Sequence, residues 1–179
     1  MKSKYQIILC LFMILLILPL KSEGQNLGYY PMKFSFRNSE GQIRDTMMSR
    51  LLIGIWSKSN SFPNYLQWKD LPFSVRVSSI DGVGLFTDTL NAYNSGDTIG
   101  YAFFKRASTG KFSLDYFHSS LGTFINDSED PNMDVMITSK GILIRANRFI
   151  ASNTELTINY RAVIALFPND PTVSKLIYW

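Results

Sequence analysis

Three short stretches of this 179-residue chain contain residues whose types could bind a ligand. The first is a glycine turn at residues 81–84, where the missing side chains would let a ligand approach the backbone closely. The second, residues 121–132, is rich in asparagine and carboxylates, and the third, residues 155–160, ends in a tyrosine. Amide, carboxylate and phenol groups can hold a ligand by hydrogen bonds. Each stretch taken alone also fits an ordinary turn, because Gly, Asn, Asp, Ser and Pro favour turns.

Three motifs follow one another in a fixed order. Residues 75–86 have the form V-x-V-x-x-x-x-G-x-G-L-F, residues 126–132 read N-x-S-x-D-P-N, and residues 148–160 read R-x-I-x-x-x-x-E-L-T-x-x-Y. In this order they resemble the landmarks of SET-domain protein lysine methyltransferases, and their short spacing is similar to that of compact bacterial and phage members. The resemblance implies methyl transfer from S-adenosylmethionine to a protein lysine side chain. It also implies that family's fold, a mainly β arrangement of small curled sheets with a threaded C-terminal segment and one or two accompanying helices.

The same resemblance assigns roles to individual residues. Tyr160 is implied as the catalytic residue, whose phenol orients the lysine amine for in-line attack rather than acting as a strong base. The residues implied in cofactor binding are Gly82, Val83, Gly84, Asn126 and Asp127. The residues implied in the substrate channel are Tyr101, Phe103, Tyr116 and Ile158, with Phe104 as a further candidate. The aromatic residues could equally belong to the core, which is the commoner place for such side chains.

Three positions differ from the usual family pattern. Asp127 stands where the family usually has histidine, and it puts a carboxylate near the implied cofactor site. Glu129 stands where the family often has cysteine. Ile158 stands where many members have Phe or Tyr, at a position associated with the number of methyl groups added, so the sequence leaves that number open.

Histidine and cysteine counts exclude several other kinds of site. His118 is the only histidine, and Cys10, the only cysteine, lies in the apolar N-terminal segment. Neither a catalytic dyad nor a cysteine-ligated zinc site can be built from them, and no metal is expected. The formal net charge of +4 falls to +2 when residues 1–24 are set aside. Such a small excess gives no argument for nucleic acid as a partner.

A local acidic cluster lies within and after the second motif. It consists of Asp127, Glu129, Asp130 and Asp134. The glycine and the terminal glutamate of a calcium loop are missing. We interpret the cluster as a solvated turn that could recognise a basic peptide.

Residues 1–24 are typical of a secretory signal peptide or a membrane anchor. Lys2 and Lys4 precede an unbroken apolar run over residues 7–20, which is shorter than the about 20 residues of a membrane span. Small residues at Ser22 and Gly24 suit cleavage just after them. The sequence therefore predicts a secreted or periplasmic protein, with a membrane-anchored form as the alternative and no other membrane contact.

The remaining sequence predicts a mainly β domain with flanking segments. Residues 25–70 form an N-terminal flank with an irregular or extended start, a helix over residues 45–56 with Asp45 as its N-cap, and a loop over residues 57–70. The SET-like domain spans residues 71–161, and residues 162–179 form a tail packed on it. Alternation and turn residues predict strands over residues 73–78, 85–86, 98–104, 133–137, 142–146 and 156–160.

Two functions from different classes stay open. The first is the lysine methyltransferase that the motifs imply, acting on a protein or peptide substrate. The second follows from the N-terminal segment, because S-adenosylmethionine is a cytoplasmic metabolite that an exported chain would not meet. An exported chain could be a non-catalytic SET-like binding or structural module, or it could be an enzyme delivered into another cell. The substrate protein and the oligomeric state are not defined by the sequence.

Overall fold

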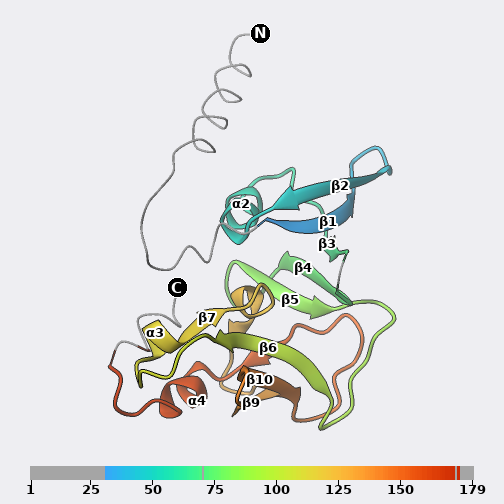
Figure 1. Ribbon diagram of the computed structural model, residues 1–179. Helices are drawn as coiled ribbons and strands as arrows, with labels where there is room; N and C mark the ends of the chain where they lie inside the picture. The colour runs from blue at the N-terminus through green and yellow to red at the C-terminus, as the bar shows by residue number, and fades with distance from the viewer. Residues whose placement is uncertain (1–30, 70, 172, 174–179) are drawn as a thin grey trace, which may run out of the picture.

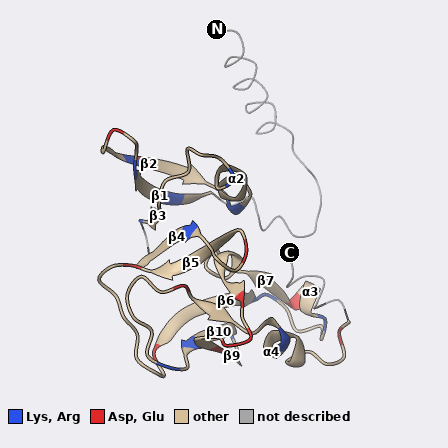
Figure 2. Cartoon of the chain, turned by 180° about the vertical axis from the view of Figure 1, so that it is seen from behind, with Lys and Arg blue, Asp and Glu red and all other residues tan. Residues whose placement is uncertain are grey.

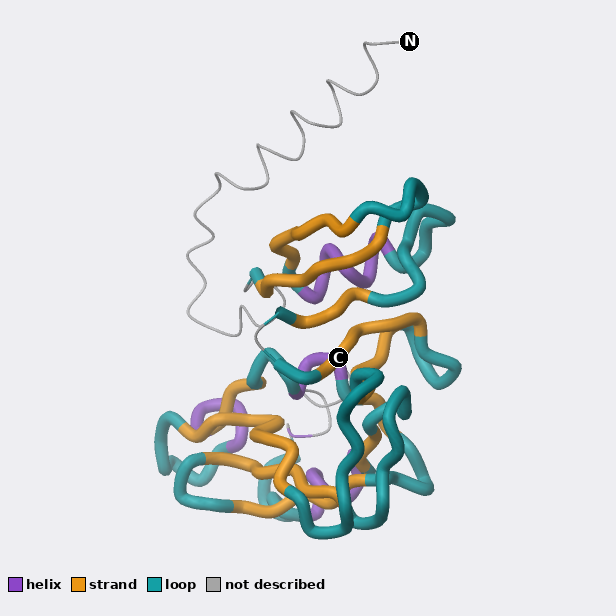
Figure 3. Tube along the Cα trace, turned by 90° about the vertical axis from the view of Figure 1, so that its right-hand side faces the viewer, coloured by secondary structure: helices purple, strands orange, loops and turns teal. Residues whose placement is uncertain are grey.

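The computed structural model describes residues 31–69, 71–171 and 173, and within them the strands form three small sheets (Figure 1). The predicted signal peptide or anchor over residues 1–24 lies outside the described residues. A five-stranded sheet has the order β2-β1-β3-β4-β5, a four-stranded sheet has the order β7-β6-β10-β9, and a two-stranded sheet joins β11 to β8. Figure 3 shows the β1–β2 end of the first sheet and the four-stranded sheet at opposite ends of the molecule.

The five-stranded sheet is antiparallel throughout. Its strands are β1 (Met32–Arg37), β2 (Ile43–Met48), β3 (Leu66–Trp68), β4 (Phe73–Val77) and β5 (Val83–Thr87). The side chain of Phe34 is fully buried, with its ring centroid 5.4 Å from that of Trp68 and 6.4 Å from that of Phe124. Hydrogen-bonded strands thus continue across residue 71 and join the N-terminal segment to the strands that carry the glycine turn.

The helix predicted over residues 45–56 is wrong in its first half. Residues 43–48 form strand β2, and helix α2 spans Arg50–Trp56 with Ser49, not Asp45, as its N-cap. Asp45 instead forms an ion pair with Lys69 at 2.7 Å. Apolar residues spaced at 47, 48, 51 and 52 fit a helix, but pairing with β1 decides the structure of this segment. Strand β3 likewise lies inside the predicted loop over residues 57–70.

The four-stranded sheet carries three of the six strands expected from the sequence. It contains β6 (Thr98–Lys105), β7 (Tyr116–His118), β9 (Met133–Ile137) and β10 (Gly141–Ala146). The predicted strands over 98–104, 133–137 and 142–146 are confirmed within one residue at each end. Helix α3 (Phe112–Asp115) connects β6 to β7.

The two-stranded sheet is parallel and joins two of the motifs. Strand β8 (Asn126–Asp127) follows the 3-10 turn Gly122–Phe124, and β11 (Thr157–Ile158) lies beside it with Thr157 opposite Asn126. The predicted strand over residues 156–160 therefore ends early, because Asn159 caps helix α4 (Tyr160–Ala165) by accepting a hydrogen bond from the Arg161 backbone N–H. Tyr160 is the first residue of that helix.

The segment after α4 returns to the aromatic core. The ring centroid of Phe167 lies 4.9 Å from that of Phe112 and 5.1 Å from that of Tyr116, and Val173 is fully buried. No helix in the described part of the chain is long and apolar enough to cross a membrane. Basic and acidic positions are both scattered over the molecule, from the β1–β2 hairpin to the region of α4, and neither sign is confined to one end (Figure 2).

Candidate functional site

The glycine turn between β4 and β5 is held from within by Ser78. The Ser78 N–H donates to the Gly82 carbonyl at 3.1 Å, and the Ser78 hydroxyl accepts from the N–H groups of Ile80 at 2.8 Å and Asp81 at 3.3 Å. Gly82 has φ +50°, and nothing lies within 4 Å of the position that a Cβ atom would take there. The turn therefore uses a backbone conformation that suits glycine and leaves open space beside it.

The Asn126 side chain points back to this turn and is only 7% exposed. Its Nδ2 donates to the Asp81 carbonyl at 3.1 Å and to Glu155 Oε1 at 2.8 Å, with the Val83 carbonyl at 3.5 Å. These acceptors fix the orientation of the amide, so its Oδ1 is the end left over. In the described part of the chain Oδ1 has no hydrogen-bond partner, which leaves it as an acceptor for a ligand.

Glu155 connects the three motifs. Its Oε1 accepts from Asn126 Nδ2 and from the Ser78 hydroxyl at 2.7 Å. Gly84 lies directly against it, because a Cβ atom built on Gly84 would overlap Oε1 and lie 2.8 Å from Glu155 Cδ and 3.2 Å from Asn126 Nδ2. The second glycine of the turn therefore allows the close approach of this carboxylate, which a side chain at position 84 would displace.

Asn132 fastens the third motif to the second. Its Nδ2 donates to the Glu155 carbonyl at 2.7 Å, and its Oδ1 accepts from the Thr157 N–H at 2.9 Å. The Ser128 N–H donates to the Ile158 carbonyl at 2.9 Å. The parallel pair of β8 and β11 is thus held by the Asn132 side chain on one side and by this backbone hydrogen bond on the other, which compensates for its having only two residues in each strand.

Tyr160 is held at two points by the segment that carries Asn126. Its hydroxyl donates to the Ile125 carbonyl at 2.6 Å. Its backbone N–H donates to Asp127 Oδ1 at 2.7 Å. The structure therefore brings Gly82, Gly84, Asn126 and Tyr160 onto three segments that are hydrogen-bonded to one another, and Val83 lies between the two glycines on β5.

Asp127, the departure from the family histidine, satisfies a backbone donor at the start of α4. The first N–H groups of a helix have no partner inside the helix, and a carboxylate is a favoured acceptor there. Its contact with Tyr160 explains how this chain accommodates a carboxylate at the position.

The residues expected in the substrate channel do not gather in one place. Phe103 is 3% and Tyr116 6% exposed, and both lie in a buried aromatic cluster around Phe112, with ring centroids 5.1 Å and 5.3 Å from it. The Tyr101 ring instead packs 5.4 Å from that of Phe104, which is 39% exposed.

A register shift between β6 and β10 accounts for this separation, because it changes which face of β6 Tyr101 occupies. Ile158 lies in a different sheet from the four aromatic residues, which are on β6 and β7 of the four-stranded sheet. It is 2% exposed, on β11 opposite Asp127.

Asp115 ends helix α3 beside Tyr116 and is a buried carboxylate. Burial raises the pKa of this carboxyl, but hydrogen bonds from the N–H and hydroxyl of Thr109 and the N–H of Gly110 outweigh it and hold the pKa below its usual value. Burial, and then the Asp115 charge, raise the pKa of the Tyr116 phenol. Tyr116 is therefore a neutral hydrogen-bonding group at physiological pH.

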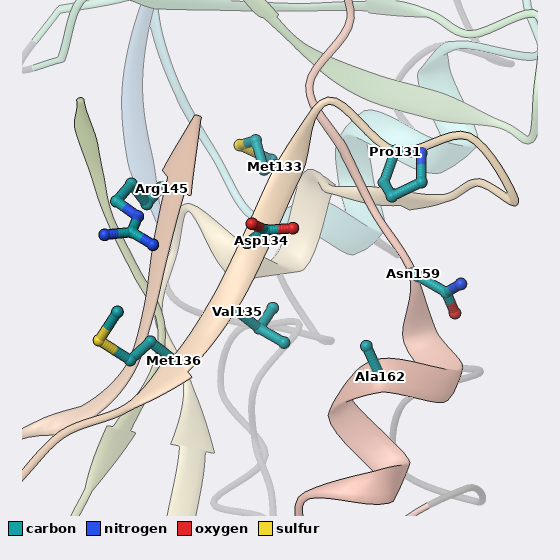
Figure 4. Close-up of a pocket in the computed structure, with 8 residues that line it drawn as sticks. All are labelled: Pro131, Met133, Asp134, Val135, Met136, Arg145, Asn159 and Ala162. Atoms are coloured by element: carbon teal, nitrogen blue, oxygen red, sulfur yellow. The ribbon is translucent and has the colours of Figure 1, made fainter. Parts of the chain in front are cut away.

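A separate cavity of about 250 Å³ lies between β9 and α4 (Figure 4). It is lined by Pro131, Met133, Asp134, Val135, Met136, Arg145, Asn159 and Ala162. None of the residues implied in cofactor binding lines it. The residues that the structure describes also contain no group of three or more His, Cys, Asp or Glu side chains placed to hold a metal ion.

The comparison with protein families agrees with the motifs and their geometry. The model of the SET domain matches residues 20–161. Because this match covers more than half of the chain, the chain belongs to the SET-domain family. The predicted mainly β fold of small sheets is confirmed, and the described residues contain three short α-helices, α2, α3 and α4, where one or two were expected. The family match also includes the strands β1 to β3 that precede residue 71.

Two solved structures are similar to parts of the chain. One is a proposed histone methyltransferase of Plasmodium falciparum, with 17% identity and a TM-score of 0.39, covering 50% of this chain and 93% of the other. The second is a humanized mutant of Polycomb Repressive Complex 2 from Chaetomium thermophilum bound to an inhibitor, with 18% identity, a TM-score of 0.40, and coverage of 56% and 15%. These values are too low to carry an argument about activity. No curated protein sequence matches the chain.

Three residues of the site were not singled out from the sequence. Asn132 stands inside the second motif and Glu155 inside the third, and these positions were the signal that could have indicated a role. Ser78 stands in a serine pair before the glycine turn. Nothing in its local sequence distinguishes it from a turn residue, and only the contact with Glu155 reveals its part.

Proposed function

We propose that this chain transfers a methyl group from S-adenosylmethionine to the side-chain amine of a protein lysine. The observation that carries the proposal is the Asn126 amide, a nearly buried side chain whose donors are used by the glycine turn and Glu155 and whose Oδ1 has no partner among the residues that the structure describes. An acceptor held in this way suits the ammonium group of an amino acid. The open space beside Gly82 leaves room for such a ligand next to the turn.

The site residues fit the cofactor that the family uses. Asn126 Oδ1 and the backbone around Gly82, Val83 and Gly84 would hold it, since glycines allow the backbone to approach a ligand. S-adenosylmethionine, when bound, supplies an electrophilic methyl group on a sulfonium. The Asp127 carboxylate is engaged by the Tyr160 N–H. In this proposal Asp127 therefore acts on the protein rather than on the cofactor.

Tyr160 would orient the lysine amine. Its hydroxyl donates to the Ile125 carbonyl, which fixes the direction of the O–H bond. A phenol oxygen accepts as well as donates, so it can receive an N–H of the incoming amine and align it for attack. The lysine has to lose its proton before reaction, and transfer from water into the protein lowers its pKa from the reference value of about 10.4.

The experiment that tests this proposal is a calorimetric titration of S-adenosylmethionine into the full chain. Asn126→Ala removes the unpartnered acceptor, and the affinity is expected to fall at least about tenfold, the effect of losing one hydrogen bond to a charged group. Asn94→Ala is the matched control, since Asn94 is exposed and outside the site. Tyr160→Phe is expected to leave the affinity unchanged. Saturable binding that Asn126→Ala does not weaken would contradict the proposed site.

A second candidate function is favoured by the apolar run over residues 7–20, which predicts export. We propose it as the alternative: a secreted, periplasmic or membrane-anchored SET-like module that binds a partner without catalysis. The two candidates differ in the same titration, because the binding module requires no affinity for the cofactor.

A further inference from the structure

We propose that Asp127 is a positioning residue for Tyr160, replacing the usual family histidine with a carboxylate that fixes the first turn of α4. The inference rests on the proposed function, because it concerns the tyrosine that would orient the lysine amine. The observation behind it is the hydrogen bond from the Tyr160 backbone N–H to Asp127 Oδ1 at 2.7 Å.

Asp127 and Ile125 hold the two ends of one residue. Ile125 accepts from the Tyr160 hydroxyl at 2.6 Å, while Asp127 accepts from the backbone N–H of the same residue. Asn126, between them in sequence, points its side chain the other way, to the glycine turn. The short segment 125–127 therefore sets the distance between the cofactor asparagine and the phenol.

The start of α4 needs such a contact. The helix has only six residues, far fewer than the about 12–15 at which an isolated helix becomes even marginally stable. Its N-cap Asn159 accepts from the Arg161 N–H at 2.9 Å. That bond leaves the Tyr160 N–H for Asp127, so the two acceptors satisfy different donors.

The geometry separates the effects of Asp127 and Asn126. The Asn126 amide is oriented by Asp81 and Glu155, neither of which bonds to Asp127. Loss of the Asp127 carboxylate would therefore release the Tyr160 end of the site and leave the cofactor end in place. Turnover should fall while the affinity for S-adenosylmethionine stays the same.

Two substitutions in the full chain separate the acceptor from the charge. Asp127→Asn removes the charge and keeps an oxygen that can accept from the Tyr160 N–H, whereas Asp127→Ala removes both. Ser49→Ala is the matched control, because it removes a helix cap of α2, a helix that contains no residue of the site. The Tyr160 ring is followed by NMR in protein labelled with ring-¹³C tyrosine, and its signal is assigned by its loss in Tyr160→Phe.

Asp127→Ala is expected to move or broaden the Tyr160 ring signal, whereas Asp127→Asn and Ser49→Ala leave it in place. In the same samples all three variants should bind S-adenosylmethionine within about twofold of the parent chain. The substituted side chains make no hydrogen bond to the groups proposed to hold the cofactor, and a change at such an independent site has little effect on affinity. Transfer of a heavy methyl group to lysines of a protein extract should fall at least about tenfold for Asp127→Ala only, as expected for a misplaced orienting group.

Two results would overturn the inference. An unmoved ring signal in Asp127→Ala would show that the carboxylate does not position Tyr160. Equal disturbance by Asp127→Asn and Asp127→Ala would show that the charge, not the acceptor, matters. If the parent chain fails to bind the cofactor, the proposed function fails, but the ring signal still decides whether Asp127 holds the tyrosine.

Discussion

The contact between Gly84 and Glu155 makes Gly84→Ala the sharpest structural test of the site. The φ of Gly84 lies outside the left-handed region, so alanine meets no backbone penalty there. Its methyl group would instead overlap Glu155 Oε1 and lie 2.8 Å from Cδ, a distance that real Cβ atoms do not tolerate. The carboxylate must move, and it then loses the hydrogen bonds from Ser78 and Asn126 at 2.7 Å and 2.8 Å.

The size of the effect follows from those two hydrogen bonds. A hydrogen bond to a charged group contributes roughly 1.5–3 kcal/mol, and water can replace part of it because Glu155 is half-buried. We therefore expect Gly84→Ala to lower the free energy of unfolding by about 1–3 kcal/mol in urea denaturation. Affinity for S-adenosylmethionine should fall about tenfold, because the Asn126 amide loses its orientation. Gly54→Ala is the control, since nothing lies within 4 Å of its Cβ position and alanine inside helix α2 is expected to leave stability unchanged or raise it.

A double-mutant cycle refines this test. In a Glu155→Ala background the obstructing carboxylate is absent, so adding Gly84→Ala should cost almost nothing further in stability. Neighbouring sites that share a contact show such non-additivity, whereas independent sites add. If the double variant lost as much stability as the two single variants together, the steric reasoning would be refuted.

Three further predictions concern other parts of the structure. Gly122→Ala should destabilise the chain by about 3 kcal/mol in urea denaturation, because its Cβ would overlap the Ala102 carbonyl oxygen and lie 2.8 Å from the carbonyl carbon. Backbone atoms cannot move aside as the end of a side chain can. A stability no lower than that of Gly54→Ala would contradict this prediction. Asp115→Asn should lower stability at neutral pH. The folded pKa of Asp115 lies below 3.8, so the stability that its charge contributes is present above that value and is lost as pH falls through the folded pKa. The free energies of unfolding of the parent chain and of Asp115→Asn should therefore converge in acid. A difference between them that does not change with pH would count against the charge. Tyr160→Phe should abolish most methyl transfer at unchanged cofactor affinity, and undiminished transfer would remove Tyr160 from the reaction.

Local patterns were sufficient for the glycine turn and for three strands of the four-stranded sheet, β6, β9 and β10, but not for β7. Short apolar runs bounded by turn residues indicated the strands over residues 133–137 and 142–146, and this signal is contained in the segments themselves. The helix over residues 45–56 was wrong at its start because the apolar spacing there fits both a helix and a strand. Pairing with β1 decided between helix and strand, and this contact cannot be predicted from the sequence of residues 45–56 by itself.

The site was predictable in outline and not in its connections. The order of the motifs placed Asn126 and Tyr160 correctly in hydrogen-bonded segments. The backbone N–H of Tyr160 is hydrogen-bonded to Asp127, which lies 33 residues earlier, and Glu155 is hydrogen-bonded to Ser78, 77 residues earlier. Such long-range contacts leave no periodic trace, and the β-bulge that turns Tyr101 away from Phe103 is equally invisible in the sequence.

The most direct test of the central claim is transfer of a heavy methyl group. The full chain is incubated with S-adenosylmethionine carrying a deuterated methyl group and with a protein extract, and lysine residues are analysed by mass spectrometry. Lysines that carry the heavy methyl group, and that are absent when Tyr160→Phe replaces the parent chain, are the predicted result. Absence of heavy-methyl lysine with the parent chain under conditions where it binds the cofactor would contradict the account.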